Sequence, residues 1–151
     1  MNVMKVLESQ GPSQEQLQSV LNLYTHGKLQ QALSESSQML ERFPNSVVLH
    51  NISGASNAAL KRFDAAIDSY KQALRIKPDY AEVHNNMGSV MKDKGDLEQA
   101  IESYKQALRI KPDYAVAHNN MAKAMKDKGD LEEAIESYKQ ALRIKPDYAE
   151  V

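Results

Sequence analysis

The feature that most constrains this chain is a repeat of 34 residues. Residues 81–114 and 115–148 differ at only six of 34 positions, and residues 47–80 share the second half of the same pattern. A period of about 20 to 50 residues is typical of solenoids, propellers and other repeat arrays. The sequence therefore divides into an N-terminal extension (1–12), a divergent first repeat (13–46), three further repeats (47–80, 81–114 and 115–148) and the start of a truncated fifth (149–151).

Hydrophobic spacing within each repeat predicts two helices. In the third repeat, Val83, Val90 and Met91 recur at helical intervals, and the stretch from Leu97 to Leu108 does the same. No useful length of sequence alternates apolar and polar residues with the period of two that a half-buried strand requires. The expected fold class is therefore all-α.

Turn residues indicate where these helices begin and end. Gly95 can adopt the left-handed conformation that ends the first helix, and Pro112 stops the second. Asp96, with Gln99 three residues later, is placed to cap the second helix, and Asp113 is placed to cap the first helix of the next repeat. The pattern thus predicts a helix, a tight turn, a second helix and a Pro-Asp-Tyr junction.

The second repeat lacks the glycine at this turn. Lys61 stands where the other three repeats have Gly27, Gly95 and Gly129. If Lys61 adopts a positive φ angle, the turn carries a strain of about 1 kcal/mol. The alternative is a turn of different shape, and the sequence leaves both open.

The second helix of each repeat carries a recurring set of small, aromatic and turn residues. This pattern resembles the tetratricopeptide repeat (TPR), and the resemblance covers about nine-tenths of the chain. It implies a right-handed α-solenoid of antiparallel helix pairs, a TPR superhelix in which each pair is held by its neighbours. The matching residues of the third and fourth repeats are Gly95, Leu97, Ala100, Tyr104, Ala107 and Pro112, and Gly129, Leu131, Ala134, Tyr138, Ala141 and Pro146.

The sequence departs from the family pattern in the first repeat and in the first helices of the repeats. Ser36 stands where the first repeat should have an aromatic residue, and the first helices carry His50, His84 and His118 at a position that is usually aromatic. Stacking would place these histidines a helix pair apart, which is too far for one metal ion. We therefore expect them to be partly buried packing residues.

Composition excludes several classes of function. The chain has 19 Lys and Arg against 20 Asp and Glu, and this balance argues against nucleic-acid or membrane partners held by bulk charge. It has no cysteine and no Gly-rich phosphate loop. Its carboxylates, such as Glu102, alternate with lysines, which is typical of a solvated helix face. We expect no enzyme activity, no cofactor and no metal. The absence of a signal pattern and of a membrane-length apolar run favours a cytoplasmic location.

Asparagine pairs are the strongest functional signal. They follow the histidine in mid-helix, as in His84-Asn85-Asn86 and His118-Asn119-Asn120, where asparagine is a mediocre helix former. An asparagine amide can both donate to and accept from the backbone of an extended peptide without reading its sequence. The alternative is that near-identical repeats inherited these residues by duplication, as aids to solubility. The sequence supports both interpretations.

The TPR resemblance implies where a ligand would lie. In similar arrays the fifth, sixth, ninth, twelfth and thirteenth positions of the first helix line the concave surface, and Ile52 occupies one of them. Asn86 and Asn120 match the asparagine ladder of O-linked N-acetylglucosamine transferases. The carboxylate clamp of other TPR proteins is excluded, since its fifth-position lysine is missing. The candidate peptide-binding residues are Asn51, Asn85, Asn86, Ser89, Lys92, Asn119, Asn120, Lys123 and Lys126.

The leading hypothesis is a protein–protein interaction scaffold that holds an extended peptide or a partner helix in its concave groove. One alternative is a substrate-presenting arm of a larger glycosyltransferase- or sulfotransferase-type enzyme, similar to the TPR regions of bacterial proteins that resemble O-linked N-acetylglucosamine transferase. Another is RNA binding, which the neutral charge and the strict 34-residue period disfavour. The last is an engineered repeat protein without a ligand.

Both ends of the array carry expectations. No polar helix follows the fourth repeat, so its face around Ile135, Leu142 and Ile144 is expected to seek a partner, such as a second copy of the chain. At the other end, residues 1–11 carry Val3 and Leu7 and are expected to cover the first repeat as a turn or short helix.

Overall fold

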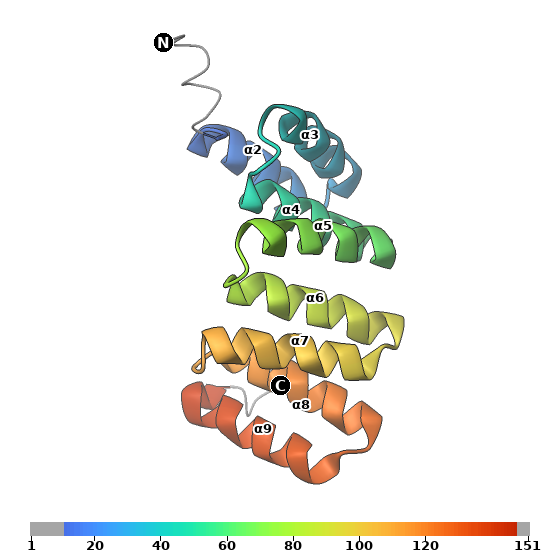
Figure 1. The fold of residues 1–151 in the computed structure, drawn as a ribbon, viewed down its shortest axis with the longest axis vertical. Coiled ribbons are helices and arrows are strands. Elements are labelled where there is room, and N and C mark those ends of the chain that lie inside the picture. Colours follow the sequence, from blue (N-terminus) through green and yellow to red (C-terminus); the bar gives the residue numbers. More distant parts are fainter. Residues whose placement is uncertain (1–10, 148–151) are drawn as a thin grey trace. The chain divides into compact units, whose positions relative to one another are not determined.

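The computed structural model describes residues 11–147, which contain α-helices, a short 3₁₀ segment at 146–147 and no β-strand (Figure 1). The fold class predicted from the sequence, all-α, is therefore confirmed. The first unit, Met1–Pro78, contains α2 (Gln14–Thr25), α3 (Leu29–Arg42), α4 (Val47–Ala59) and α5 (Phe63–Ile76). The second unit, Asp79–Val151, contains α6 (Ala81–Lys94), α7 (Leu97–Ile110), α8 (Ala115–Lys128) and α9 (Leu131–Ile144).

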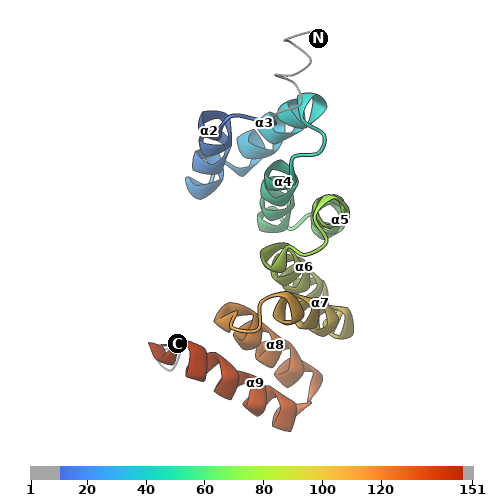
Figure 2. The same cartoon turned by 60° about the vertical axis from the view of Figure 1, so that its left-hand side comes forward.

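The described part of each unit contains two helix pairs that pack in sequence order. In the second unit α6 packs on α7, α7 on α8 and α8 on α9, and the first unit repeats this order from α2 to α5 (Figure 2). The first helices of consecutive pairs also touch, α2 with α4 and α6 with α8. Each helix pair thus buries its apolar side against a sequence neighbour, which is the packing of an α-solenoid.

The predicted cover at residues 1–10 and the start of a fifth repeat at 149–151 lie outside the described residues. Between residues 11 and 147, no helix combines the length and apolar character needed to cross a bilayer.

Glycine and one lysine make the turns inside the helix pairs. Gly95 and Gly129 end α6 and α8 with φ angles of 99° and 101°, as their sequence positions predicted. Lys61 takes the same left-handed region with a φ of 61°, which settles the alternative that the sequence left open. The turn of the second repeat therefore keeps the shared shape and carries backbone strain that glycine would avoid.

The predicted aspartate caps are wrong. Asp96 precedes α7, but its side chain makes no capping hydrogen bond, and its ψ angle of 68° lies outside the extended region that a capping residue requires. Its carboxylate instead lies 4.0 Å from Lys94 Nζ. Asp113 does not cap α8 either, because the residue before that helix is Tyr114. Only Ser13, with a ψ of 157°, forms a capping box among the described helices.

A buried tyrosine lies at the centre of the third repeat. The Tyr104 side chain is fully buried, and a Cβ built at Gly88 would lie 2.8 Å from its Cε1 atom. Glycine at this position therefore lets α6 approach the ring closely. The fourth repeat has Ala122 there, and its tyrosine, Tyr138, is only half-buried.

The first unit has a core of different composition. Val20, Ala32 and Ile52 form a buried cluster, so Ile52 is a core residue and the expectation that it lines a concave surface is wrong. Ser36, which replaces the aromatic residue of the other repeats, is fully buried, as is Ser56. Neither hydroxyl has a hydrogen-bond partner among the described residues.

Candidate functional site

The nine predicted ligand-binding residues all lie on first helices of helix pairs. Asn51 lies on α4 in the first unit and is half-buried. The other eight lie on α6 and α8 of the second unit, where these two helices touch. We call them the α6–α8 surface: Asn85, Asn86, Ser89, Lys92, Asn119, Asn120, Lys123 and Lys126.

The structure divides the asparagines of this surface into two kinds. Asn85 is only 4 % exposed, and its side-chain oxygen accepts a hydrogen bond of 3.1 Å from Asn120 Nδ2. Asn86, Asn119 and Asn120 are half-buried. Asn85 therefore connects the two helices, and Asn120 is the more exposed member of that pair.

A second hydrogen-bond chain runs below the surface toward α7. Tyr104 Oη donates to Ser89 Oγ at 3.2 Å, and Ser89 Oγ donates to the backbone oxygen of Asn85 at 3.2 Å. The pKa of Tyr104 is raised to about 12, mainly by burial. The hydrogen bond with Ser89 lowers this pKa, and the negative charge of Asp93 raises it. The tyrosine hydroxyl therefore stays protonated at neutral pH and acts as the donor that orients Ser89.

Three lysines give this surface a local positive charge. Lys92 is half-buried, whereas Lys123 and Lys126 are exposed on α8. None of the three makes a salt bridge with a described residue. Asp93 and Asp127 follow two of them in sequence, but each interacts with the tyrosine of its own repeat and raises its pKa. The lysine ammonium groups are thus available to an acceptor from outside.

The histidines hold the junctions between helix pairs. His118 Nε2 lies 3.0 Å from the backbone oxygen of Pro112, and His50 Nε2 lies 2.8 Å from that of Pro44. A carbonyl oxygen only accepts, so Nε2 carries the hydrogen in both residues. Both rings are half-buried, in agreement with their expected packing role. Residues 11–147 contain no cluster of three His, Asp or Glu side chains able to hold a metal ion.

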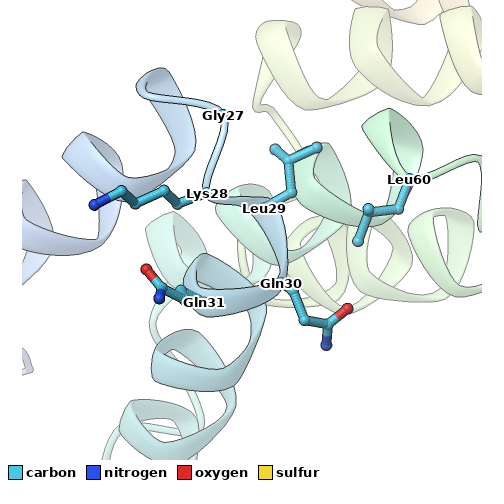
Figure 3. A pocket seen from close by; sticks show the side chains of 6 residues that line it. All are labelled: Gly27, Lys28, Leu29, Gln30, Gln31 and Leu60. Atoms are coloured by element: carbon cyan, nitrogen blue, oxygen red, sulfur yellow. The ribbon is translucent and has the colours of Figure 1, made fainter.

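A shallow pocket of about 380 Å³ opens in the first unit, where the turn between α2 and α3 faces the end of α4 (Figure 3). Leu29 and Leu60 provide apolar surface, and the Lys28 side chain extends away from Leu60 (Figure 3). Arg62 Nη2, in the turn after α4, donates to Gln30 Oε1 at 3.2 Å. The pocket residues are Gly27, Lys28, Leu29, Gln30, Gln31 and Leu60, none of them predicted as ligand-binding.

The second unit has a pocket at the equivalent repeat positions, with a volume of about 300 Å³. Asp96, Glu98 and Lys128 here replace Lys28, Gln30 and Leu60. The shape of this pocket therefore comes from the repeat, and its chemistry changes from apolar to charged.

Sequence reasoning missed that Asn85 is an internal partner of Asn120. A usable signal was present, because the fifth position of one repeat and the sixth position of the next are 35 residues apart and both hold asparagine. The fifth-position asparagine of the third repeat thus faces the sixth-position asparagine of the fourth.

Comparisons with known proteins agree with this architecture. A family model described as TPR repeat matches residues 57–95, 88–129 and 125–151. A crystal structure of MamA is 25 % identical, with a TM-score of 0.82 over 98 % of this chain and 87 % of that chain. MamA from Desulfovibrio magneticus RS-1 is 20 % identical, with a TM-score of 0.80 over 87 % of this chain and 75 % of that one. The Pseudomonas aeruginosa PilF structure is 21 % identical, with a TM-score of 0.81 over 87 % of this chain and 60 % of the PilF chain. No curated protein sequence matches the chain.

Proposed function

Because the chain belongs to the TPR repeat family, we propose that it is a protein–protein interaction scaffold that binds an extended peptide across the α6–α8 surface. The observation that carries this proposal is the Asn120 amide. Asn85 holds it by one N–H group, while its carbonyl oxygen and its second N–H group have no partner among the described residues. A peptide backbone offers one donor and one acceptor per residue, which is what such an amide can bind.

The charge on α8 supports a preference among peptides. Lys123 and Lys126 lie beyond Asn119 and Asn120 on the same helix and make no salt bridge with a described residue. Exposed lysines contribute a modest, salt-dependent attraction. We therefore expect acidic peptides to bind more tightly than basic ones of equal length, and this difference to shrink as salt is raised. A substrate-presenting arm of a larger enzyme would use the same surface.

The test is a pair of alanine substitutions, Asn86→Ala and Asn120→Ala, combined in one variant. A library of extended synthetic peptides is first titrated against the unaltered chain by fluorescence anisotropy. The variant should bind the selected peptides at least about tenfold more weakly, because loss of two amide contacts costs on the order of 1 kcal/mol each. Unchanged affinity would refute the proposal.

A matched control separates binding from folding. Asn45 is exposed in the loop between α3 and α4, outside the α6–α8 surface, so Asn45→Ala should bind peptides as the unaltered chain does. Helicity measured by circular dichroism should agree among all three proteins. A loss of helicity in the double variant calls for Asn120→Ala alone, which leaves Asn85 without a side-chain donor but keeps Asn86.

Self-association through the last helix pair stays a prediction from the sequence and is tested separately from peptide binding. Light scattering over a range of concentrations measures it directly. A molar mass that rises with concentration would support it, and a monodisperse monomer would contradict it.

A further inference from the structure

Lys61 holds a backbone conformation that glycine holds in the other repeats. Its φ angle of 61° is the only positive one among the described non-glycine residues, and the equivalent Gly27, Gly95 and Gly129 have φ angles of 74°, 99° and 101°. Strained backbone conformations cluster at functional sites. The Lys61 side chain is exposed and makes no salt bridge with a described residue, so no internal ion pair accounts for a lysine here.

The strained turn borders the shallow pocket of the first unit. Leu60 lines this pocket and directly precedes Lys61, and Arg62 directly follows it. Arg62 Nη2 donates at 3.2 Å to Oε1 of Gln30, which lines the same pocket. The six residues that line the pocket, together with Lys61 and Arg62, are called the first-unit pocket below.

The first-unit pocket has room for one large apolar side chain. Leu29, at the start of α3, and Leu60, directly after α4, are half-buried and supply its apolar lining (Figure 3). Its volume of about 380 Å³ lies at the lower end of the range for ligand sites. An apolar side chain that fills it would remove the exposed parts of both leucines from water, which is favourable.

Positive side chains border this apolar lining. Lys28, Lys61 and Arg62 are all exposed, and the first-unit pocket contains no carboxylate. The Lys28 side chain extends away from Leu60, so its charge lies at the outer edge (Figure 3). The nearest carboxylate along the chain, that of Asp64, lies in the first turn of α5 and does not line the pocket. Charge complementarity therefore favours an acidic ligand.

The equivalent pocket of the second unit has the opposite charge, so the repeat itself does not dictate a basic pocket. Asp96 and Glu98 line the second pocket, and Asp130 stands where the first unit has Arg62. Lys128 is the one lysine among the residues that line it and forms a salt bridge of 3.2 Å with Asp130. The basic character is thus specific to the first unit.

An acidic peptide fits these features better than a nucleic acid or a membrane. The phosphate groups of a nucleic acid would bind Lys61 and Arg62 but leave the apolar lining unused. A membrane-binding surface buries an apolar face in the lipid, whereas Leu29 and Leu60 are half-buried in a recess. A peptide offers carboxylates and an apolar side chain on one short segment.

We propose that the first-unit pocket binds an acidic segment of a partner protein through one large apolar side chain. That side chain contacts Leu29 and Leu60, and the carboxylates beside it pair with Lys61 and Arg62. None of these residues belongs to the α6–α8 surface. The proposal therefore goes beyond the proposed function, and either of the two can fail without the other.

The experiment titrates the ¹⁵N-labelled full chain with a heptapeptide that has phenylalanine between two triplets of Asp and Glu. Amide chemical shifts are followed by NMR at low salt, because salt screens exposed charges. The amide signals of Gly27, Leu29 and Lys61 should shift in a saturable way. Each amide reports separately, so binding at the α6–α8 surface would appear as a second set of shifts. A peptide with serine in place of phenylalanine should bind the first-unit pocket more weakly, and a peptide with lysine triplets should not bind it.

The variants take residues that the other repeats hold at the same positions. Lys61→Gly should weaken binding at the Gly27 amide by about threefold or more, because a positive charge is lost, whereas Lys61→Arg keeps the charge and should bind as the unaltered chain does. Leu60→Lys, the residue of the third and fourth repeats, adds a positive charge. It should still weaken binding of the phenylalanine peptide by about fivefold or more, since the apolar lining is lost. Circular dichroism should show equal helicity in all variants.

Four results would overturn the proposal. They are an absence of saturable shifts at the first-unit pocket, equal binding there of the phenylalanine and serine peptides, binding that is insensitive to Lys61→Gly, and tighter binding by Leu60→Lys. Shifts confined to the α6–α8 surface would support the proposed function and refute this one. Larger effects at Lys61 from a single-stranded oligouridine or from anionic phospholipid vesicles would assign the turn to those ligands instead.

Discussion

Asn120 Nδ2 donates a hydrogen bond of 3.1 Å to Asn85 Oδ1 across the contact between α6 and α8. Asn85 is almost completely buried, so its side chain serves the fold, while the partly open Asn120 is held in one amide orientation. The buried Asn85 therefore has a structural role that neither sequence interpretation included, whether ligand binding or inheritance by duplication as an aid to solubility. Asn120 stays the candidate ligand contact.

This hydrogen bond predicts an energetic coupling between the two repeats. Asn85→Ala should lower the free energy of unfolding by about 1–2 kcal/mol, because it also leaves the Asn120 amide without its acceptor. In a double-mutant cycle with Asn120→Ala, the coupling energy from urea denaturation should be about 0.5–1.5 kcal/mol. Additive single effects would show that the contact is not energetically important.

The strained turn at Lys61 predicts a stabilising substitution. Lys61→Gly should raise the free energy of unfolding by up to about 1 kcal/mol, because glycine adopts a φ of 61° without the steric cost that a side chain brings. As the reverse control, Gly95→Ala at a φ of 99° should lower it by a similar amount. Thermal melts of both variants show whether each substitution stabilises or destabilises the fold. A destabilised Lys61→Gly protein would contradict the prediction that the turn at Lys61 is strained.

The buried hydroxyls of the first unit predict a second stabilising change. Ser36→Ala and Ser56→Ala each remove a fully buried oxygen that has no partner among the described residues, so each should be neutral or stabilising by about 1 kcal/mol. The matched control is Ser103→Ala, which removes a hydroxyl that donates to Met91 Sδ at 3.5 Å. If Ser36→Ala lost as much stability as Ser103→Ala, the hydroxyl of Ser36 would have a partner after all.

The buried tyrosines predict a loss of stability in alkali. Burial raises the pKa of Tyr104 to about 12, and burial together with the nearby Tyr24 raises that of Tyr70 as well. In the unfolded chain tyrosine ionises near pH 10. Above about pH 10 the unfolded state loses protons that the folded state keeps, so the free energy of unfolding should fall as pH rises toward 12, and this contribution is fully present below pH 10.

Tyr104→Phe isolates the contribution of one tyrosine to this loss of stability in alkali. The variant should lose stability at pH 7, since Ser89 loses its donor, but its stability should fall less steeply between about pH 10 and 12. Urea denaturation at several pH values measures both effects. Equal slopes for the variant and the unaltered chain would show that Tyr104 ionises alike in both states.

Much of the fold could be predicted because it depends on local and periodic information. The 34-residue period, the helical spacing within each repeat and the glycine at the turn were enough to predict all-α helix pairs, and Gly95 adopts the expected φ. The aspartate caps could not be predicted in the same way. A side chain caps a helix only if the backbone before the helix is extended, and the tight turn at Gly95 gives Asp96 a ψ of 68° instead.

The candidate site depends on contacts between repeats, and a repeated sequence does not show which of its equivalent residues make those contacts. Asn85 and Asn86 look equivalent in the sequence, but only packing of α6 against α8 buries the first and turns it into a partner of Asn120. Ile101 and Ile135 have almost identical neighbours along the chain, and the expected exposure of the face around Ile135 is confirmed, since Ile135 is 54 % exposed and Ile101 only 7 %. Short-range order is encoded within each repeat, whereas the burial of each residue depends on what lies next to it in space, so the tertiary structure decides which of two neighbouring asparagines is buried.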